Sequence, residues 1–139
     1  FALITNDPHV TRNLMRTSTP FTTSDARERI MRLRRKNLPV WAIDDGQLMG
    51  LIGLAGEFGL WIARHAWGNG YGSESGRLVI RYAFEQLKMP ALHAHPISDN
   101  RASYRLMEKL GFQAIGRGVG FCRHRGKFVP LRRYTLENR

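Results

Sequence analysis

The chain has 139 residues, of which 42% are hydrophobic and 24% are charged, a composition typical of a globular protein. We expect a single domain over residues 1–139, because this length leaves little room for a second one. Twenty-two Lys and Arg residues against eleven Asp and Glu residues give a net charge of +11, which favours an anionic partner. The lone cysteine, Cys122, excludes an internal disulfide and a zinc site built from thiolates alone.

The first segment of the chain predicts short helices and then one longer helix. Residues 1–16 are ambiguous and are compatible with a helix broken near Asp7-Pro8. A clear helix opens at Ser24-Asp25, where Asp25 and Glu28 resemble a capping box. Apolar residues at helical spacing then give this helix an apolar stripe, which consists of Ala26, Ile30 and Leu33.

Three predicted strands follow and form an antiparallel meander. They cover residues 40–43, 48–54 and 58–63. The dipeptide Asp45-Gly46 is a strong hairpin signal between the first two strands.

The second half predicts two further helices and three further strands. A helix over 73–88 has an apolar stripe, which consists of Leu78, Val79, Tyr82, Ala83 and Leu87. A strand over 91–96 precedes a helix over 101–110, which we expect to bury Ala102, Leu106, Met107 and Leu110. The last two strands, 112–115 and 128–136, are joined by a basic, glycine-rich loop. This order predicts an α+β fold with one strand–helix–strand crossover at its centre.

A glycine cluster joins the third strand to the long helix. Gly68, Gly70 and Gly72 alternate with larger residues immediately before the helix. Main-chain N–H groups at a helix start are unpaired and lie at the positive end of the helix dipole. Glycines let the chain bend tightly and let a phosphate approach those groups. The cluster therefore indicates a phosphate site, although the same glycines could merely form a tight turn.

Two segments together resemble the GNAT N-acetyltransferases, in particular the branch that includes the ribosomal-protein N-terminal acetyltransferases. The first is Leu60-Trp61-Ile62-Ala63-Arg64 followed by Trp67-Gly68-Asn69-Gly70-Tyr71-Gly72-Ser73-Glu74, and the second runs from Asp99-Asn100-Arg101-Ala102-Ser103 to Glu108-Lys109-Leu110-Gly111-Phe112. The resemblance covers about residues 20–136 and implies a mixed, mainly antiparallel twisted sheet flanked by helices. Trp67 stands where the family motif has a Gln or Arg, and the family's first strand is not evident here.

The resemblance implies an acetyl-CoA site. The main chain of Leu60, Trp61 and Ile62 would bind the pantetheine arm as an added strand does. The diphosphate would lie on Trp67, Gly68, Asn69, Gly70, Tyr71, Gly72 and Ser73. Asn100 would bond the region of the thioester, since an amide offers both a donor and an acceptor; its plainer role is a helix N-cap.

The resemblance also implies direct attack of an amine on the thioester, without a protein nucleophile. Many members place a tyrosine seven residues after the asparagine, where this chain has Met107, which cannot donate a proton. Ser103 occupies the position associated with the leaving thiolate, and Glu57 is the candidate base. Ser103 could equally be a small polar residue in a helix's first turn, and Glu57 a loop carboxylate.

Other reactive residues have plainer interpretations. His93 and His95 alternate along a predicted strand and could deprotonate the amine, or bind a metal with His124 and Cys122. Partly buried strand histidines are the simpler interpretation, and we predict no metal. Cys122 lies among Arg123, His124 and Arg125, which would lower the pKa of its thiol, but no motif surrounds it.

The sequence thus predicts an acetyl-CoA-dependent N-acetyltransferase acting on a primary amine, either a protein N-terminus or a small molecule. The alternatives are a basic nucleic-acid-binding module and a non-catalytic CoA-binding sensor. Arg117, Arg123, Arg125 and Lys127 could hold a carboxylate on the acceptor. No apolar run reaches the roughly 20 residues of a membrane span and no signal-peptide pattern is present, so we expect a soluble, cytoplasmic monomer or homodimer. Because the chain begins with Phe1 rather than methionine, we expect residues to precede it.

Overall fold

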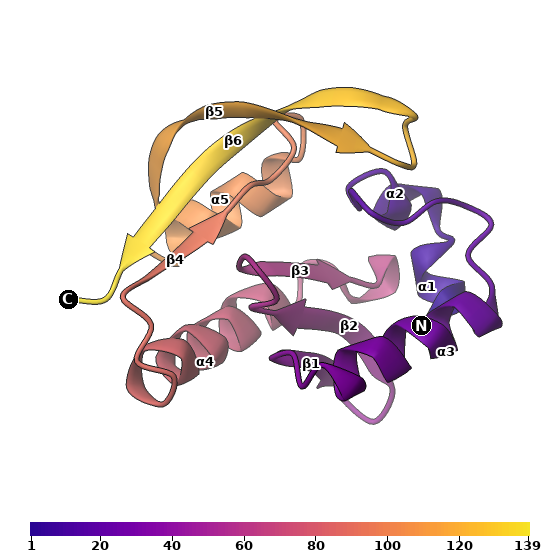
Figure 1. The fold of residues 1–139 in the computed structure, drawn as a ribbon, viewed down its shortest axis with the longest axis horizontal. Coiled ribbons are helices and arrows are strands. Elements are labelled where there is room, and N and C mark those ends of the chain that lie inside the picture. Colours follow the sequence, from indigo (N-terminus) through magenta and orange to yellow (C-terminus); the bar gives the residue numbers. More distant parts are fainter.

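In the computed structural model, which describes residues 1–139, helices pack around two three-stranded antiparallel sheets (Figure 1). The first sheet has the order β1-β2-β3 and is formed by β1 (Val40–Asp44), β2 (Leu48–Gly53) and β3 (Gly59–Ile62). The second has the order β4-β6-β5 and is formed by β4 (Ala91–Ala94), β6 (Lys127–Glu137) and β5 (Gln113–Cys122). The predicted α+β class is confirmed, with the strands divided between two sheets.

The two sheets meet at their edge strands, β3 and β4. One main-chain hydrogen bond joins this region, from the N–H of Phe58 to the carbonyl oxygen of His93, at 2.8 Å. Beyond this hydrogen bond β3 and β4 diverge, and the space between them, which we call the opening, separates the two sheets (Figure 1). The turn η1 (Arg64–Ala66) and the helix α4 (Tyr71–Glu85) connect β3 to β4, which confirms the predicted strand–helix–strand crossover.

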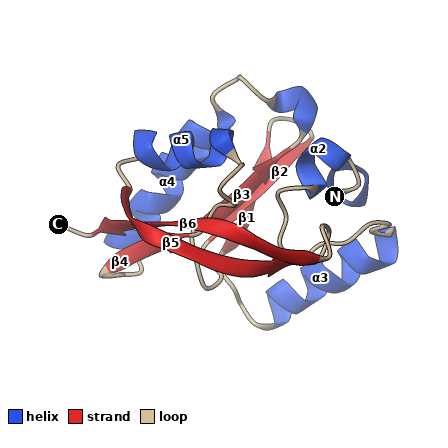
Figure 2. Cartoon of the chain, turned by 90° about the horizontal axis from the view of Figure 1, so that it is seen from above, coloured by secondary structure: helices blue, strands red, loops and turns tan.

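The helices before β1 pack beside the opening (Figure 2). The predicted break is present: Asp7 separates α1 (Ala2–Thr5) from α2 (Pro8–Thr11) and accepts a hydrogen bond from the N–H of His9. The helix α3 (Thr23–Arg35) starts earlier than predicted, because its capping box is formed by Thr22 and Asp25 and not by Asp25 and Glu28. No helix combines the length and the apolar character that crossing a membrane requires.

The core lies between the sheets and the two helices α4 and α5 (Arg101–Lys109). Val79 and Ala83 of α4 are buried as predicted, but Leu78, Tyr82 and Leu87 are exposed. The buried face of α4 also includes Gly72 and Gly76. The prediction missed these two positions because it searched for large apolar residues. In α5, Met107 is buried, Leu106 and Leu110 are partly buried against the core, and Ala102 is exposed, contrary to the prediction.

The predicted basic loop over 116–127 is instead a long hairpin. Strand β5 runs to Cys122 and β6 starts at Lys127, so only a short turn separates them. The alternating glycines of this segment are the reason that the strand was not predicted. At Gly120 an added Cβ would lie 2.9 Å from Met15 Cε, so the end of the Met15 side chain would have to shift. Cys122 is therefore a fully buried strand residue and not a loop residue.

Candidate functional site

The turn before α4 carries six consecutive unpaired main-chain N–H groups. None of the N–H groups from Gly68 to Ser73 donates to a main-chain or side-chain acceptor of the protein. Gly68 and Gly70 have φ of +76° and +80°, a left-handed conformation that glycine adopts without steric cost. The turn thus combines free donors with the positive end of a 15-residue helix, which is the arrangement that binds phosphate groups.

Three side chains hold this turn in place. The indole N–H of Trp67 donates to the carbonyl oxygen of Ile62 at 2.8 Å. The side-chain amide of Asn69 donates to the carbonyl oxygens of Ala66 and Trp67, both at 3.1 Å. The hydroxyl of Tyr71 donates to Asp45 at 2.6 Å, and this bond to a carboxylate raises the pKa of Tyr71. These side chains fix the turn, and its main-chain N–H groups are the part left free to bind a ligand.

Gly72 allows the start of α4 to pack closely against α5 and β3. A Cβ at this position would lie 3.0 Å from Leu106 Cδ2 and 3.4 Å from Ile62 Cδ1. The absent side chain brings the free N–H groups near the edge of the first sheet.

Strand β3 presents a free edge next to the turn. It pairs only with β2, and the N–H of Ala63 points to β2 because it bonds to Met49. Hydrogen-bonding direction alternates along an antiparallel edge strand. The N–H groups of Leu60 and Ile62 therefore face the opening, where an extended ligand can pair with them.

A cavity of about 360 Å³ joins these features, and we call it the turn cavity. Strand β3, the glycine turn and the first turn of α5 all contribute to it. Its lining includes ten of the eleven predicted cofactor-binding residues, namely Leu60, Trp61, Ile62, Trp67, Gly68, Gly70, Tyr71, Gly72, Ser73 and Asn100. Asn69 does not line it and instead holds the turn. The sequence prediction thus identified residues that the fold brings together.

A second cavity of about 310 Å³ lies between the diverging sheets, and we call it the cleft cavity. Both predicted catalytic residues, Glu57 and Ser103, line it. The two cavities share six lining residues: Asn13, Leu14, Leu60, Trp61, Asn100 and Ser103. These residues mark the junction at which the two cavities meet.

The junction is polar on the side of α5. The side-chain oxygen of Asn100 accepts the N–H of Ser103 at 3.3 Å, so this residue is the N-cap of α5. The hydroxyl of Ser103 has no hydrogen-bond partner in the protein, and this residue lines both cavities. Opposite them, Asn13 Oδ1 is buried without a partner. The N-cap role predicted as the simpler one for Asn100 is present and leaves its NH₂ group free.

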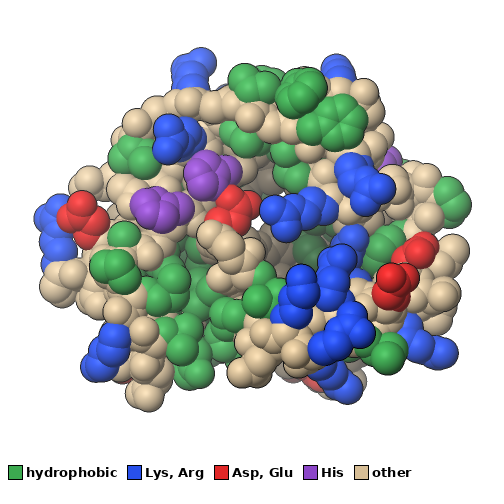
Figure 3. All heavy atoms as spheres, in the orientation of Figure 1, with side chains coloured by type: hydrophobic (Ala, Val, Ile, Leu, Met, Phe, Trp, Pro, Cys, Tyr) green, Lys and Arg blue, Asp and Glu red, His purple; other side chains and the backbone are tan.

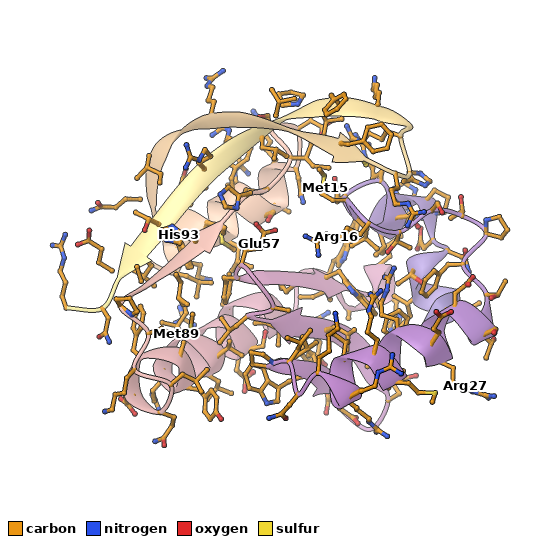
Figure 4. The ribbon with its side chains drawn as sticks, in the orientation of Figure 1. Met15, Arg16, Arg27, Glu57, Met89 and His93 are labelled. Atoms are coloured by element: carbon orange, nitrogen blue, oxygen red, sulfur yellow. The ribbon has the colours of Figure 1, made fainter.

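Glu57 is paired with His95. A carboxylate oxygen of Glu57 lies 2.5 Å from Nδ1 of His95. Glu57 precedes β3 and His95 follows β4, so the pair spans the two strands at the base of the opening. Figure 4 shows Glu57 projecting toward the space between the sheets. His93 lies exposed on β4, and no three His, Cys, Asp or Glu side chains are placed to hold a metal ion, so the alternative metal site is not formed.

The segment Arg12–Thr17, which we call the closing segment, covers the junction. Two hydrogen bonds from the tip of the β5–β6 hairpin hold the closing segment in place. The N–H of Arg123 donates to the carbonyl oxygen of Met15 at 2.9 Å, and Nε of Arg125 donates to the carbonyl oxygen of Arg12 at 3.0 Å. Arg125 also forms a two-bond ion pair with Asp99, at 2.8 and 3.0 Å. This pair holds the pKa of Asp99 below its usual value. Sequence reasoning missed this segment because no local pattern marks it.

The comparisons with known proteins agree with this geometry. The family model described as an acetyltransferase (GNAT) domain matches residues 1–113. An uncharacterized N-acetyltransferase, p20, from Bacillus licheniformis is 25% identical over 150 residues, covering 96% of this chain and 83% of that protein.

Solved structures show the same fold. A ribosomal-protein-alanine N-acetyltransferase from Brucella melitensis has a TM-score of 0.78 at 23% identity, covering 98% of this chain and 91% of that one. A spermidine N-acetyltransferase from Vibrio cholerae, in complex with CoA and spermine, has a TM-score of 0.82 at 19% identity, covering 99% of this chain and 87% of that one.

Proposed function

This chain belongs to the GNAT acetyltransferase family, and we propose that it transfers the acetyl group of acetyl-CoA to a primary amine. The observation that carries the proposal is the row of unpaired N–H groups from Gly68 to Ser73, next to the free edge of β3. The Vibrio cholerae neighbour of this fold binds CoA and spermine in its crystal. A diphosphate and an amide-bearing arm are the two chemistries that this turn and this edge would accept.

The residues of the turn cavity fit CoA. The six free N–H groups would bind the diphosphate, and the main chain of Leu60 and Ile62 would pair with the amides of the pantetheine arm. Asn100 lies at the junction with a free NH₂ donor, where the arm would end. Trp67, Asn69 and Tyr71 would keep the turn in the shape that binds the diphosphate.

When bound, acetyl-CoA supplies a thioester whose carbonyl carbon accepts the amine's lone pair, while the carbon–sulfur bond breaks and the leaving thiolate takes up a proton. Within this chain, Glu57 and His95 would receive the proton that the amine loses, because they face the cleft cavity as one hydrogen-bonded pair. The hydroxyl of Ser103 would donate toward the thiolate, since it is free of other partners and lies at the junction. Met107 also lines the cleft cavity and is buried, so it contributes only apolar surface.

Titration calorimetry with CoA and a thiol-release assay with a panel of amines test the proposal. We expect CoA to bind and thiol release to require both acetyl-CoA and an amine. CoA binding without thiol release from any amine would identify a non-catalytic sensor. Absence of CoA binding, together with salt-dependent binding to nucleic acid, would instead favour the nucleic-acid module.

A further inference from the structure

The cleft cavity carries opposite charges on opposite walls. Glu57 and His95 lie on the wall formed by the start of β3 and the end of β4. Arg16, from the closing segment, and Arg29, from α3, line the other wall. Figure 4 shows Glu57 and Arg16 on opposite sides of the same space, and Figure 3 shows Lys and Arg side chains gathered at its mouth. A ligand between these walls meets an acid at one end and guanidinium groups at the other.

The two arginines have no acidic partner. The ion pairs of the chain are Arg12–Asp99, Arg125–Asp99, His95–Glu57 and Arg139–Glu137. The half-buried guanidinium of Arg29 donates only to neutral oxygens, the hydroxyl of Thr17 at 2.7 Å and the carbonyl of Arg16 at 3.3 Å. The guanidinium of Arg29 also lies 4.7 Å from the ring centroid of Phe21. No carboxylate is bonded to this partly buried cation, so an anion that reached it would be stabilised.

Further positive charge surrounds this wall. A smaller hollow of about 230 Å³ on the outer side is lined by Arg16 and Arg29 together with Arg32 and Arg123. Its acidic residues are Glu28 and Asp25, and the carboxylate of Asp25 is already bonded to Thr22 in the cap of α3. Burial, followed by the charges of Arg32 and Arg123, lowers the pKa of Arg29, and the charge of Asp25 opposes this only in part. The wall is therefore electropositive from both sides.

We propose that the acceptor carries an anionic group, a carboxylate in the simplest case, which Arg16 and Arg29 bind while its amine faces Glu57. The inference rests on the proposed acetyl transfer and names the acceptor class: an amino-acid-like molecule or a peptide with an acidic side chain near its N-terminus. A cavity of about 310 Å³ accommodates a small molecule or the first residues of a peptide. A polyamine such as spermine would place positive charge against these arginines, so it is disfavoured.

The test compares acceptors that differ only in the anionic group. One pair is 5-aminopentanoate and 5-aminopentanamide; the other is two short peptides that begin Ala-Glu and Ala-Gln; spermidine is the polycation. We expect kcat/KM for the carboxylates to exceed that for their amides by about tenfold or more, mainly through KM. The more reactive pair distinguishes a small acceptor from a peptide.

Variants assign the preference to this wall. Arg16→Gln removes an exposed side chain that makes no internal hydrogen bond, and it should reduce the ratio of kcat/KM for the carboxylate to kcat/KM for the amide about tenfold. Arg29→Lys should keep the fold and lose part of the preference, because lysine retains the charge but not the guanidinium geometry. The control is Arg27→Gln on the same helix, because Arg27 projects away from the cavity (Figure 4).

CoA calorimetry separates the two proposals. If CoA binds but carboxylates and amides react equally, or spermidine reacts best, the acceptor inference is overturned and acetyl transfer stands. If CoA binds and no acceptor turns over, binding of 5-aminopentanoate and its amide to the CoA complex decides: tighter binding of the carboxylate supports the inference, and equal or absent binding overturns it. If CoA does not bind, the proposed function itself fails.

Discussion

Replacing Gly70 with alanine tests the role of the glycine turn directly. Gly70 has φ +80°, and an added Cβ would meet no atom within 4 Å, so the substitution introduces backbone strain without a clash. A left-handed conformation costs a non-glycine residue about 1–2 kcal/mol. For a chain of this length we expect Tm to fall by about 3–6 °C per kcal/mol.

The same strain should weaken CoA binding. Any rotation that relieves it turns the N–H groups of Tyr71 and Gly72 away from the diphosphate. One hydrogen bond to a charged group contributes about 1.5–3 kcal/mol, so losing one raises the Kd of CoA about tenfold to hundredfold. Calorimetry with CoA and with pantetheine, which has no diphosphate, measures this. Pantetheine affinity should be unchanged.

Gly46 provides a matched control for this variant. It has φ +81°, an added Cβ there would also meet open space, and it lines neither the turn cavity nor the cleft cavity. Gly46→Ala should lower Tm by a similar amount and leave the Kd of CoA unchanged. Our reasoning would be refuted if Gly70→Ala lost stability as Gly46→Ala does but bound CoA as tightly as the parent protein.

Three further predictions concern side chains. Glu57→Gln should lower kcat about 100-fold without changing CoA affinity, because it removes the carboxylate of the Glu57–His95 pair; an unchanged kcat in steady-state assays would make Glu57 a loop carboxylate only. Asp99→Asn should lower Tm at pH 7 by the equivalent of up to about 1 kcal/mol, since Asp99 is 48% exposed. The pKa of Asp99 in the folded protein lies below the usual 3.8, so this stabilisation is present above about pH 4 and is lost as the pH falls through the folded pKa. The Tm values of the parent and the variant should therefore converge in acid. A difference in Tm that stays constant with pH would contradict this assignment. Cys122 is fully buried, so its thiol should react with an aromatic disulfide reagent only as fast as the protein unfolds; rapid labelling with retained structure would contradict this.

The parts of the site that could be predicted are those that the sequence encodes locally. Turn geometry depends on residues a few positions apart, so Gly68, Gly70 and Gly72 were sufficient to place the free N–H groups. The N-cap at Asn100 was predictable for the same reason. The hairpin formed by β5 and β6 could not be predicted from local sequence. Its glycines suggest a loop, whereas pairing between the two strands makes it part of a sheet.

Contacts between distant residues could not be predicted in this way. Glu57 and His95 were each singled out, but they are 38 residues apart and only the meeting of β3 and β4 makes them a pair. The closing segment depends on Arg125, which is 113 residues from Arg12. The expected acceptor arginines illustrate the same limit: Arg125 is engaged by Asp99, whereas Arg16 and Arg29, which the sequence did not mark, line the cleft cavity.

The distribution of unpaired groups argues for an enzyme and against a nucleic-acid module. Free N–H groups at the turn, the free edge of β3, the Glu57–His95 pair and the two arginines without acidic partners lie along two cavities that share a junction. In the proposed reaction these groups would, in turn, bind the diphosphate, pair with the amides of the pantetheine arm, accept a proton and bind the anionic group of the acceptor. A nucleic-acid surface needs repeated phosphate contacts over a broad face. Arg16 and Arg29 instead line one space, a cavity of about 310 Å³.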